Sequence, residues 1–315
     1  MRSKILLIVK YYMIFKLLIL ILILIYFKDI IIKNNLKARD VVLCVIAKNE
    51  NLYIKEFVDY YKNIGVKKIY LYDNNDINGE NFNDVLNNYI NSEFIKVKNI
   101  RGKSEIQILA YNDCYQRHLN EYSWFMFLDV DEFLFIKNNK SLSNFLSDDR
   151  FFNCNSIFIN YNEYGDSDLV KYDNRSILKR FNKSQYNICG KSLTRGGIKN
   201  AKIDIHKPLY INNYCNSKGE SEELYKNKIF ISKIMVDNVE LKHFITKSLE
   251  EFCQRLVKGW PSIKKFSKGY YEFVEGRIRY YFRLSKITEY KYNILKSFII
   301  GDWGLGIGDW GLGIG

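Results

Sequence analysis

Three carboxylates within four residues follow an almost wholly apolar run that begins at Trp124. They are Asp129, Asp131 and Glu132. If the run is a strand, Asp129 and Asp131 lie on one side of the chain and Val130 on the other. Two carboxylates at a strand end can hold a hard divalent cation whose open positions accept phosphate oxygens. A solvated turn is the alternative, but a turn does not require two alternating Asp. The pattern therefore favours an enzyme that acts on a phosphorylated donor.

Strand and helix patterns alternate through the part of the chain that leads to these carboxylates. Apolar, β-branched runs predict strands at 41–47, 66–72, 94–97 and 123–128, and helical spacing predicts helices at 54–61, 82–90 and 104–122. This alternation predicts an α/β fold with a doubly wound, mostly parallel sheet and flanking helices. Ligands of such sheets bind outside the carboxyl ends of the strands.

Polar residues follow three of the predicted strands at that edge. Asn49 and Glu50 follow the first strand, Asp73 and Asn74 the second, and the carboxylate cluster the fourth. Their convergence predicts one ligand site. Gln107 either caps the next helix as part of a Ser-x-x-Gln capping box or contacts the ligand, and one residue could do both. The sequence lacks G-x-G-x-x-G after the first strand and a P-loop anywhere, which disfavours those nucleotide-binding versions of the fold.

The later part of the chain is less regular. We expect strands at 156–160 and 228–234, a loop-rich stretch at 187–206, and a helix at 248–258 that Gly259 ends. The domain prediction is a membrane anchor and basic stem at 1–39, a catalytic domain at 40–260, a basic aromatic helical segment at 261–300 and a repetitive Gly/Trp tail at 301–315. Six Cys without a CxxC pair leave disulfides open, and Cys44 is expected to be a small core residue.

Charge is concentrated at the two ends of the chain. The net charge of the 315 residues is +13, residues 1–39 hold eight Lys or Arg and one acid, and residues 40–254 are neutral. This distribution argues against nucleic acid and favours a membrane as the partner of the basic ends. Residues 5–27 are apolar except for Lys10 and Lys16, which predicts a single-pass N-terminal anchor; an interfacial helix is the alternative. Basic and aromatic residues at 277–296 predict a second contact with that surface.

Five ordered segments resemble glycosyltransferase family 92 and its family-2-like relatives with a GT-A fold. The segments are Val45–Glu50, Gly65–Asn74, Gln107–Cys114, Trp124–Phe133 and His243–Phe252, with Gly259 after the last. The resemblance covers roughly residues 41–260 and implies a transferase that uses a nucleotide-sugar donor, for which UDP is the expected nucleotide. It further implies a glycan or glycolipid as the acceptor.

The resemblance also implies roles for individual residues. Asp129 and Asp131 would be the DXD pair that binds manganese or magnesium, and His243 would complete the metal shell. The implied donor contacts are Asn49, Glu50, Asp73, Asn74, Gln107 and Lys247. The general base is a carboxylate, with Glu132, Glu163, Asp166 and Asp168 as candidates. Two other functions remain open, a metal-dependent phosphodiesterase or nuclease and a non-catalytic membrane-associated scaffold.

Overall fold

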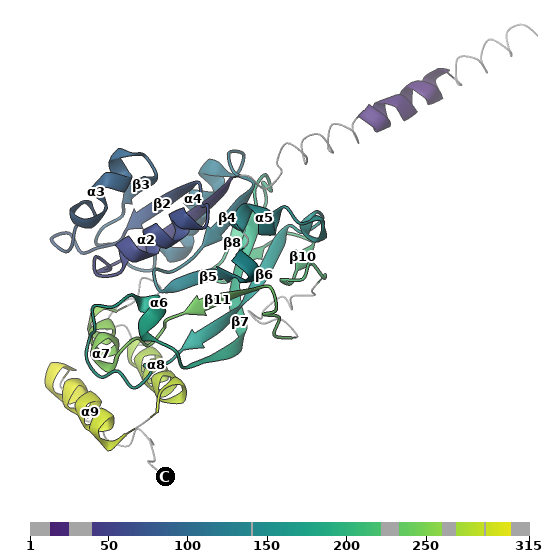
Figure 1. Cartoon of the computed structure of the whole chain (residues 1–315). Helices are drawn as coiled ribbons and strands as arrows, with labels where there is room; N and C mark the ends of the chain where they lie inside the picture. Colours follow the sequence, from purple (N-terminus) through teal and green to yellow (C-terminus); the bar gives the residue numbers. More distant parts are fainter. Residues whose placement is uncertain are drawn as a thin grey trace, which may run out of the picture. The chain divides into compact units, whose positions relative to one another are not determined.

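The computed structural model describes residues 13–24, 40–139, 141–221, 233–259, 269–286 and 288–303. The chain divides into two units, Met1–Arg39 and Asp40–Gly315 (Figure 1). In the first unit, residues 13–24 form a helix whose apolar side chains are exposed. Within the described ranges, no helix combines the length and apolar character needed to cross a bilayer. The predicted anchor spans 5–27, partly outside those ranges, and stays a prediction.

A nine-stranded mixed sheet forms the centre of the second unit. Its first half is parallel, in the order β3-β2-β1-β4, as the alternating pattern predicted. These strands are β1 (Val41–Ala47), β2 (Lys68–Asp73), β3 (Ile95–Asn99) and β4 (Trp124–Phe127). Every side chain of β1 is buried, as expected for a parallel strand with both faces covered.

The second half of the sheet continues from β4 in the order β7-β6-β11-β5 and mixes both directions. Strand β7 pairs antiparallel with β4 and with β6, and β5 pairs antiparallel with β11, whereas β6 and β11 are parallel to each other. The bounds are β5 (Glu132–Ile136), β6 (Ser156–Tyr164), β7 (Ser184–Arg195) and β11 (Val239–His243). The short strands are β8 (Lys202–Ile203), β9 (Pro208–Leu209) and β10 (Tyr214–Cys215).

The prediction of a loop-rich stretch at 187–206 is wrong for its first part, because strand β7 extends to Arg195. It carries Gly190, Lys191, Ser192 and Thr194, a composition typical of loops, yet these residues are buried. Gly190 is required because a Cβ there would lie 1.9 Å from the carbonyl oxygen of Ile159 on β6. Most of the strand predicted at 228–234 lies outside the described residues, and 233–234 are not in a strand.

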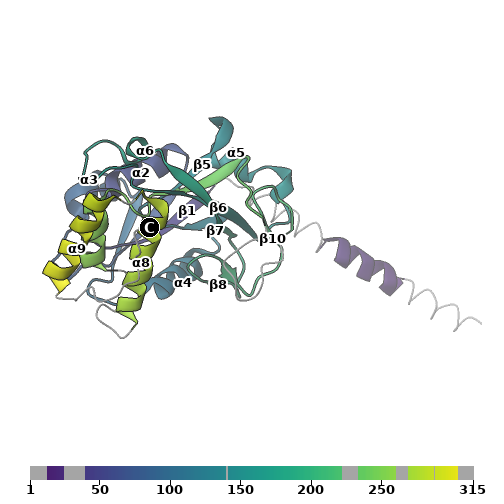
Figure 2. The ribbon, with the colours of Figure 1, turned by 90° about the horizontal axis from the view of Figure 1, so that it is seen from below.

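Helices cover the sheet, and three further helices form the C-terminal end of the described chain. The first group is α2 (Ile54–Asn63), α3 (Asn83–Asn91), α4 (Gln107–His118), α5 (Leu142–Leu146) and α6 (Ile177–Arg180), with 3-10 turns at Lys137–Asn139 and Asp149–Phe151. The second group is α7 (Leu249–Lys258), α8 (Tyr270–Leu284) and α9 (Glu289–Trp303). The members of this second group share one apolar cluster and lie together in both ribbon views (Figures 1 and 2).

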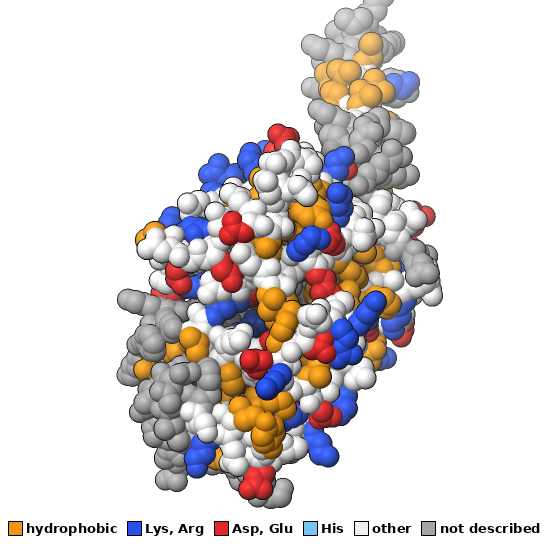
Figure 3. All heavy atoms as spheres, turned by 60° about the vertical axis from the view of Figure 1, so that its left-hand side comes forward, with side chains coloured by type: hydrophobic (Ala, Val, Ile, Leu, Met, Phe, Trp, Pro, Cys, Tyr) orange, Lys and Arg blue, Asp and Glu red, His pale blue; other side chains and the backbone are white. Residues whose placement is uncertain are grey.

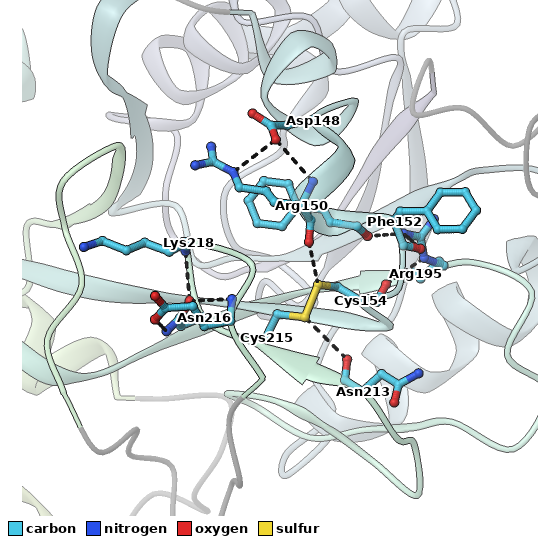
Figure 4. Close-up of a disulfide and its surroundings, with 11 residues drawn as sticks. Asp148, Arg150, Phe152, Cys154, Arg195, Asn213, Cys215, Asn216 and Lys218 are labelled. Atoms are coloured by element: carbon cyan, nitrogen blue, oxygen red, sulfur yellow. Dashed lines mark hydrogen bonds and ion pairs between the residues drawn. A yellow bond between two sulfur atoms is a disulfide. The ribbon is translucent and has the colours of Figure 1, made fainter.

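Two disulfides connect distant segments of the second unit. Cys44 of β1 is bonded to Cys114 of α4, and Cys154 is bonded to Cys215 of β10. Cys44 is therefore more than the small core residue that was expected. Figure 4 shows the second disulfide beside Arg195, whose guanidinium donates to the carbonyl oxygen of Cys154 at 2.7 Å. The first disulfide fixes the helix that begins at Gln107 against the strand that leads into the predicted site.

Reduction of the two disulfides should lower the melting temperature by on the order of 10 °C, because each closes a long loop and contributes about 2–4 kcal/mol. Thermal unfolding with and without dithiothreitol measures this. Cys189 and Cys253 are outside the two disulfides, so a variant with both replaced by Ser should show the same shift. Coincident melting curves for the oxidised and reduced protein would refute the pairing.

Candidate active site

The candidate site lies at the carboxyl ends of β1 and β4, where the chain connections leave the sheet in opposite directions. Such a switch point is the usual ligand position in an open α/β sheet. A cavity of about 60 Å³ is present there. Its lining includes Ala47 at the end of β1, Lys48 and Glu50 after it, Gln107 of α4, Asp129 and Asp131 after β4, and Arg255 and Lys258 of α7. The structure thus brings together four residues that the sequence placed in one site: Glu50, Gln107, Asp129 and Asp131.

Asp129 is the accessible carboxylate of the pair, with 33% of its side chain exposed. Its Oδ1 accepts hydrogen bonds from Gln107 Nε2 at 3.1 Å and from the Tyr111 hydroxyl at 3.2 Å. Lys191 Nζ lies 3.4 Å from its Oδ2. Helix α4 begins at Gln107 with no side-chain cap, so the capping-box interpretation is wrong and the side chain of Gln107 points to the carboxylate.

Asp131 is buried and forms an ion pair with Arg255. Burial opposes ionisation, but the charges of Arg255 and Lys247 outweigh it and hold the Asp131 pKa far below its usual range. His243 Nε2 lies 3.8 Å from Asp131 Oδ1. Neither Asp131 Oδ1 nor His243 Nδ1 has a hydrogen-bond partner among the described residues. Burial lowers the pKa of His243 to about 3, so the imidazole is neutral and able to act as a ligand.

Glu132 is separated from the cavity because its side chain is fully buried. It accepts hydrogen bonds from the Asp129 backbone N–H at 3.0 Å and from the Tyr161 hydroxyl at 2.6 Å, and Lys191 Nζ lies 3.5 Å away. Burial raises the Glu132 pKa to about 8. These contacts fix the turn that carries Asp129.

Glu163 lies on β6 beside His243 of β11, its partner in the strand register. Glu163 Oε2 accepts hydrogen bonds from Asn187 Nδ2 at 2.8 Å and from the Tyr280 hydroxyl of α8. The other acceptor-side carboxylates have different surroundings. Asp166 is buried and paired with Lys291 at 2.8 Å, and Asp168 pairs with Lys183 at the surface. Of these candidates, Glu163 is the one in register with His243.

Two of the predicted donor contacts, Asp73 and Asn74, line neither the small cavity nor the larger one beside it. Asp73 pairs with Arg101 at 2.8 Å, and Asn74 Nδ2 donates to the carbonyl oxygens of Ile100 and Lys103. These bonds hold the loop that follows β2. Asn49 lines the neighbouring cavity and has a left-handed backbone with φ of 50°.

A larger cavity of about 230 Å³ adjoins the first. Lys247, the last predicted donor contact, lines this larger cavity together with Tyr53, and Asp129 and Asp131 do not. Arg255 and Lys258 line both cavities. Figure 3 shows a hollow on one face of the molecule with Lys or Arg side chains inside it.

The sequence interpretation missed Arg255, Lys258 and Lys191. Lys258 forms an ion pair with Glu50, and Arg255 with Asp131, so α7 is tied to both strand ends. Cations in the last turn of a helix normally complement its dipole, which hid their second role. The signal that could have found them is their i, i+3 spacing, which places both on one helix face.

Two cations of the basic segment at 277–296 are not exposed as the predicted membrane contact requires. Lys291 is buried against Asp166, and Arg277 is half-buried. Burial lowers the pKa of Arg277 to about 10, and its charged neighbours include Arg255 and Asp131. Arg277 of α8 is therefore close to the candidate site, whereas other cations of the helix, Arg279 and Arg283, are exposed.

A divalent cation fits the first cavity through the two Asp side chains. Both line it, and Asp131 Oδ1 is a buried acceptor without a partner. Within the described part of the chain, no group of three or more His, Cys, Asp or Glu residues is arranged to hold a metal ion. Coordination by Asp129, Asp131 and His243 together therefore stays a prediction.

The fold and the site define an α/β protein with a charged ligand crevice at the switch point of its sheet. Residues 39–296, most of the chain, match the profile of glycosyltransferase family 92, and the chain belongs to this family. Membership argues against the phosphodiesterase and scaffold alternatives.

Individual relatives are more distant. A family 92 protein of Oryza sativa subsp. japonica is 28% identical over 110 residues, which cover 35% of this chain and 18% of that protein. One of Ricinus communis is 26% identical over 108 residues, covering 34% and 19%. The matched segment thus spans less than a fifth of either relative. The solved structure of S. aureus TarS 1-349 in complex with UDP has a TM-score of 0.39 at 12% identity, covering 85% of this chain and 72% of that one. A score this low supports no inference about this chain.

Proposed function

We propose that the protein transfers a sugar from a nucleotide-diphosphate donor, a UDP-sugar, to a hydroxyl of a glycan or glycolipid. One observation carries the proposal beyond family membership. Asp129 and Asp131 meet Arg255 and Lys258 at one cavity on the switch point of the sheet. Carboxylates that can hold a cation and side chains that bind phosphate are the two requirements of a sugar-diphosphate site.

Arg255 and Lys258 are the proposed contacts of the donor diphosphate. The bond from the sugar to the diphosphate breaks with its electron pair on the phosphate oxygen, so negative charge grows on the leaving group. Fixed cations beside that position stabilise this charge more in the transition state than in the ground state. Helix α7 presents both side chains, and Asp131 and Glu50 orient them.

Asp129 and Asp131, with His243 beside them, are the proposed holders of manganese or magnesium. The bound ion would neutralise diphosphate charge and orient the donor. Lys191 and Gln107 fix the Asp129 carboxylate, and Arg255 keeps Asp131 ionised before the ion arrives.

UDP and manganese together should raise the melting temperature more than the sum of their separate effects, because each would complete the other's binding site. A thermal-shift titration of the full chain measures this, with ADP and calcium as comparisons. Shifts that merely add, or that are absent, would count against a shared site.

Glu163 is the proposed general base. It would take the proton of the acceptor hydroxyl while that oxygen forms a bond to the sugar carbon. Glu163→Gln should lower the turnover number by about 10²–10⁴-fold and leave UDP affinity unchanged. Glu132→Gln is the comparison, since the Glu132 carboxylate accepts from the Asp129 backbone N–H and holds the turn. If Glu163→Gln retains near-normal turnover, another carboxylate is the base.

The proposed location is a membrane, with the segment 5–27 as the anchor and the second unit in an oxidising compartment. The two disulfides support the second part, because disulfides persist mainly in such compartments.

A further inference from the structure

The larger cavity contains an ammonium group, that of Lys247, whose ion pair in the described structure is long. Three cations line it, Lys247, Arg255 and Lys258. Arg255 is paired with Asp131, and Lys258 with Glu50. The nearest carboxylate oxygen to Lys247 Nζ in the described structure is Glu50 Oε2 at 3.9 Å, and that carboxylate already binds Lys258. Lys247 is therefore the cation of this cavity with capacity for a ligand.

The backbone holds Lys247 in an unfavourable conformation to place it there. Its φ is 55°, in the left-handed region that side chains other than Gly, Asn and Asp rarely adopt. Such outliers persist where the surrounding structure enforces them, often at binding sites. The side chain is 8% exposed, and Nζ lies 3.9 Å from the centre of the Tyr53 ring. The structure shows no hydrogen bond from this ammonium to the described residues, although a buried ammonium requires an acceptor.

Arg255 and Lys258 line both this cavity and the proposed donor cavity, but the other charged groups of the two cavities differ. Lys247 does not line the cavity of Asp129 and Asp131, and those two residues do not line the cavity of Lys247. A ligand group that binds Lys247 is thus distinct from the diphosphate beside the two Asp. A neutral sugar hydroxyl could accept one hydrogen bond there, but it would leave the ammonium charge uncompensated.

We propose that the larger cavity binds an anionic group, a phosphate or carboxylate, of the acceptor, with Lys247 as its central contact. This inference rests on the proposed function, since it assigns the smaller cavity to the donor. It narrows the acceptor to an anionic glycan or a phosphate-bearing lipid glycan. The lining also contains Tyr53, Gln254 and two carboxylates, Glu80 and Glu251. Glu251 is neutralised by Arg180 at 3.0 Å, which leaves the three lining cations in excess.

Inorganic phosphate is the probe for this site. We expect calorimetry to show phosphate binding to the full chain saturated with UDP and magnesium, and at least a tenfold loss of phosphate affinity in Lys247→Met. Lys242→Met is the matched control, because Lys242 of β11 also places its ammonium over an aromatic ring, Phe135, at 4.1 Å but lies outside both cavities. Lys247→Arg should retain binding. Lys247→Asn tolerates the left-handed backbone and provides a second charge-free variant that folds.

Two results would overturn the inference. Competition between phosphate and UDP would assign the larger cavity to the donor, and equal phosphate affinity in Lys247→Met and Lys242→Met would show that Lys247 binds no anion. Failure of the proposed function can be distinguished from failure of this inference. If the protein binds no UDP, it can still be titrated with phosphate alone, and the Lys247 variants then decide whether the larger cavity is an anion site.

Discussion

Asp129→Asn is expected to reduce sugar transfer by at least about 10²–10³-fold, while the fold stays intact. The amide keeps the shape of the side chain and removes the charge that would hold a divalent cation against the diphosphate. A third of the Asp129 side chain is exposed. In the neutral variant the buried cation Lys191 loses Asp129 as a partner but keeps Glu132 at 3.5 Å, so no buried charge is left unpaired. Steady-state transfer assays with UDP-sugars and manganese measure the loss.

Asp76→Asn is the matched control for this change. Asp76 is an exposed carboxylate after β2 that pairs with Lys48 at 2.7 Å, and Lys48 lines the same small cavity. Its replacement removes the same charge near the site and should change transfer little. Equal activity of Asp129→Asn and the wild type would refute the metal and donor assignment together.

Asp131 is a less direct test of the same assignment. Its replacement leaves Arg255 without its buried carboxylate partner, and breaking a buried pair in this way costs about 3–5 kcal/mol. Replacement of Asp129 leaves Lys191 with Glu132 as a partner, so Asp129 is the clearer test of the two. Loss of transfer by Asp131→Asn should be interpreted only beside its melting temperature.

The parallel half of the fold was predictable because its strands are buried on both faces. Continuous apolar runs such as Val41–Ala47 have few alternative structures, and their polar endings then mark the ligand edge. Asp129, Asp131, Glu50 and Gln107 follow from that rule, since each is close in sequence to a strand end or to the first turn of a helix.

The other half was not predictable because its signals depend on tertiary contacts. Strand β7 buries Lys191 against Asp129 and Glu132, partners about sixty residues earlier in the chain. A lysine in a polar stretch normally predicts a loop. In the same way, Arg255 resembles an ordinary cation of a helix C-terminus until α7 packs against the turn that carries Asp131. Local patterns contain no information on such pairings.

The largest expected effect on stability belongs to Arg180 and Glu251, an ion pair that holds α7 in place. Arg180 Nη1 and Nη2 donate to the two oxygens of Glu251 at 3.0 and 3.1 Å, and the side chains are 1% and 2% exposed. Glu251 also accepts from the backbone N–H and hydroxyl of Ser248 in the capping box of α7, and from Tyr53. Burial raises its pKa, but Arg180, Ser248 and Tyr53 outweigh burial and lower it.

Arg180→Met is expected to reduce the free energy of unfolding by about 3–5 kcal/mol, because it leaves Glu251 buried without its cation. The melting temperature at pH 7 should fall by on the order of 10 °C. Because the Glu251 pKa is lowered in the folded protein, the stabilisation is present above its unfolded pKa and is lost as pH falls through the folded one. The difference between wild type and variant should therefore shrink in acid.

Arg279→Met provides the comparison on the neighbouring helix α8. Arg279 pairs with Glu275 one turn away, and its side chain is 60% exposed, so its loss should cost below about 1 kcal/mol. Arg180→Met should also weaken UDP binding, since α7 carries Arg255 and Lys258 into the donor cavity, whereas Arg279→Met should not. If the two variants melt within 2 °C of each other, the buried pair does not hold α7, and the positions of Arg255 and Lys258 must depend on their own bonds to Asp131 and Glu50.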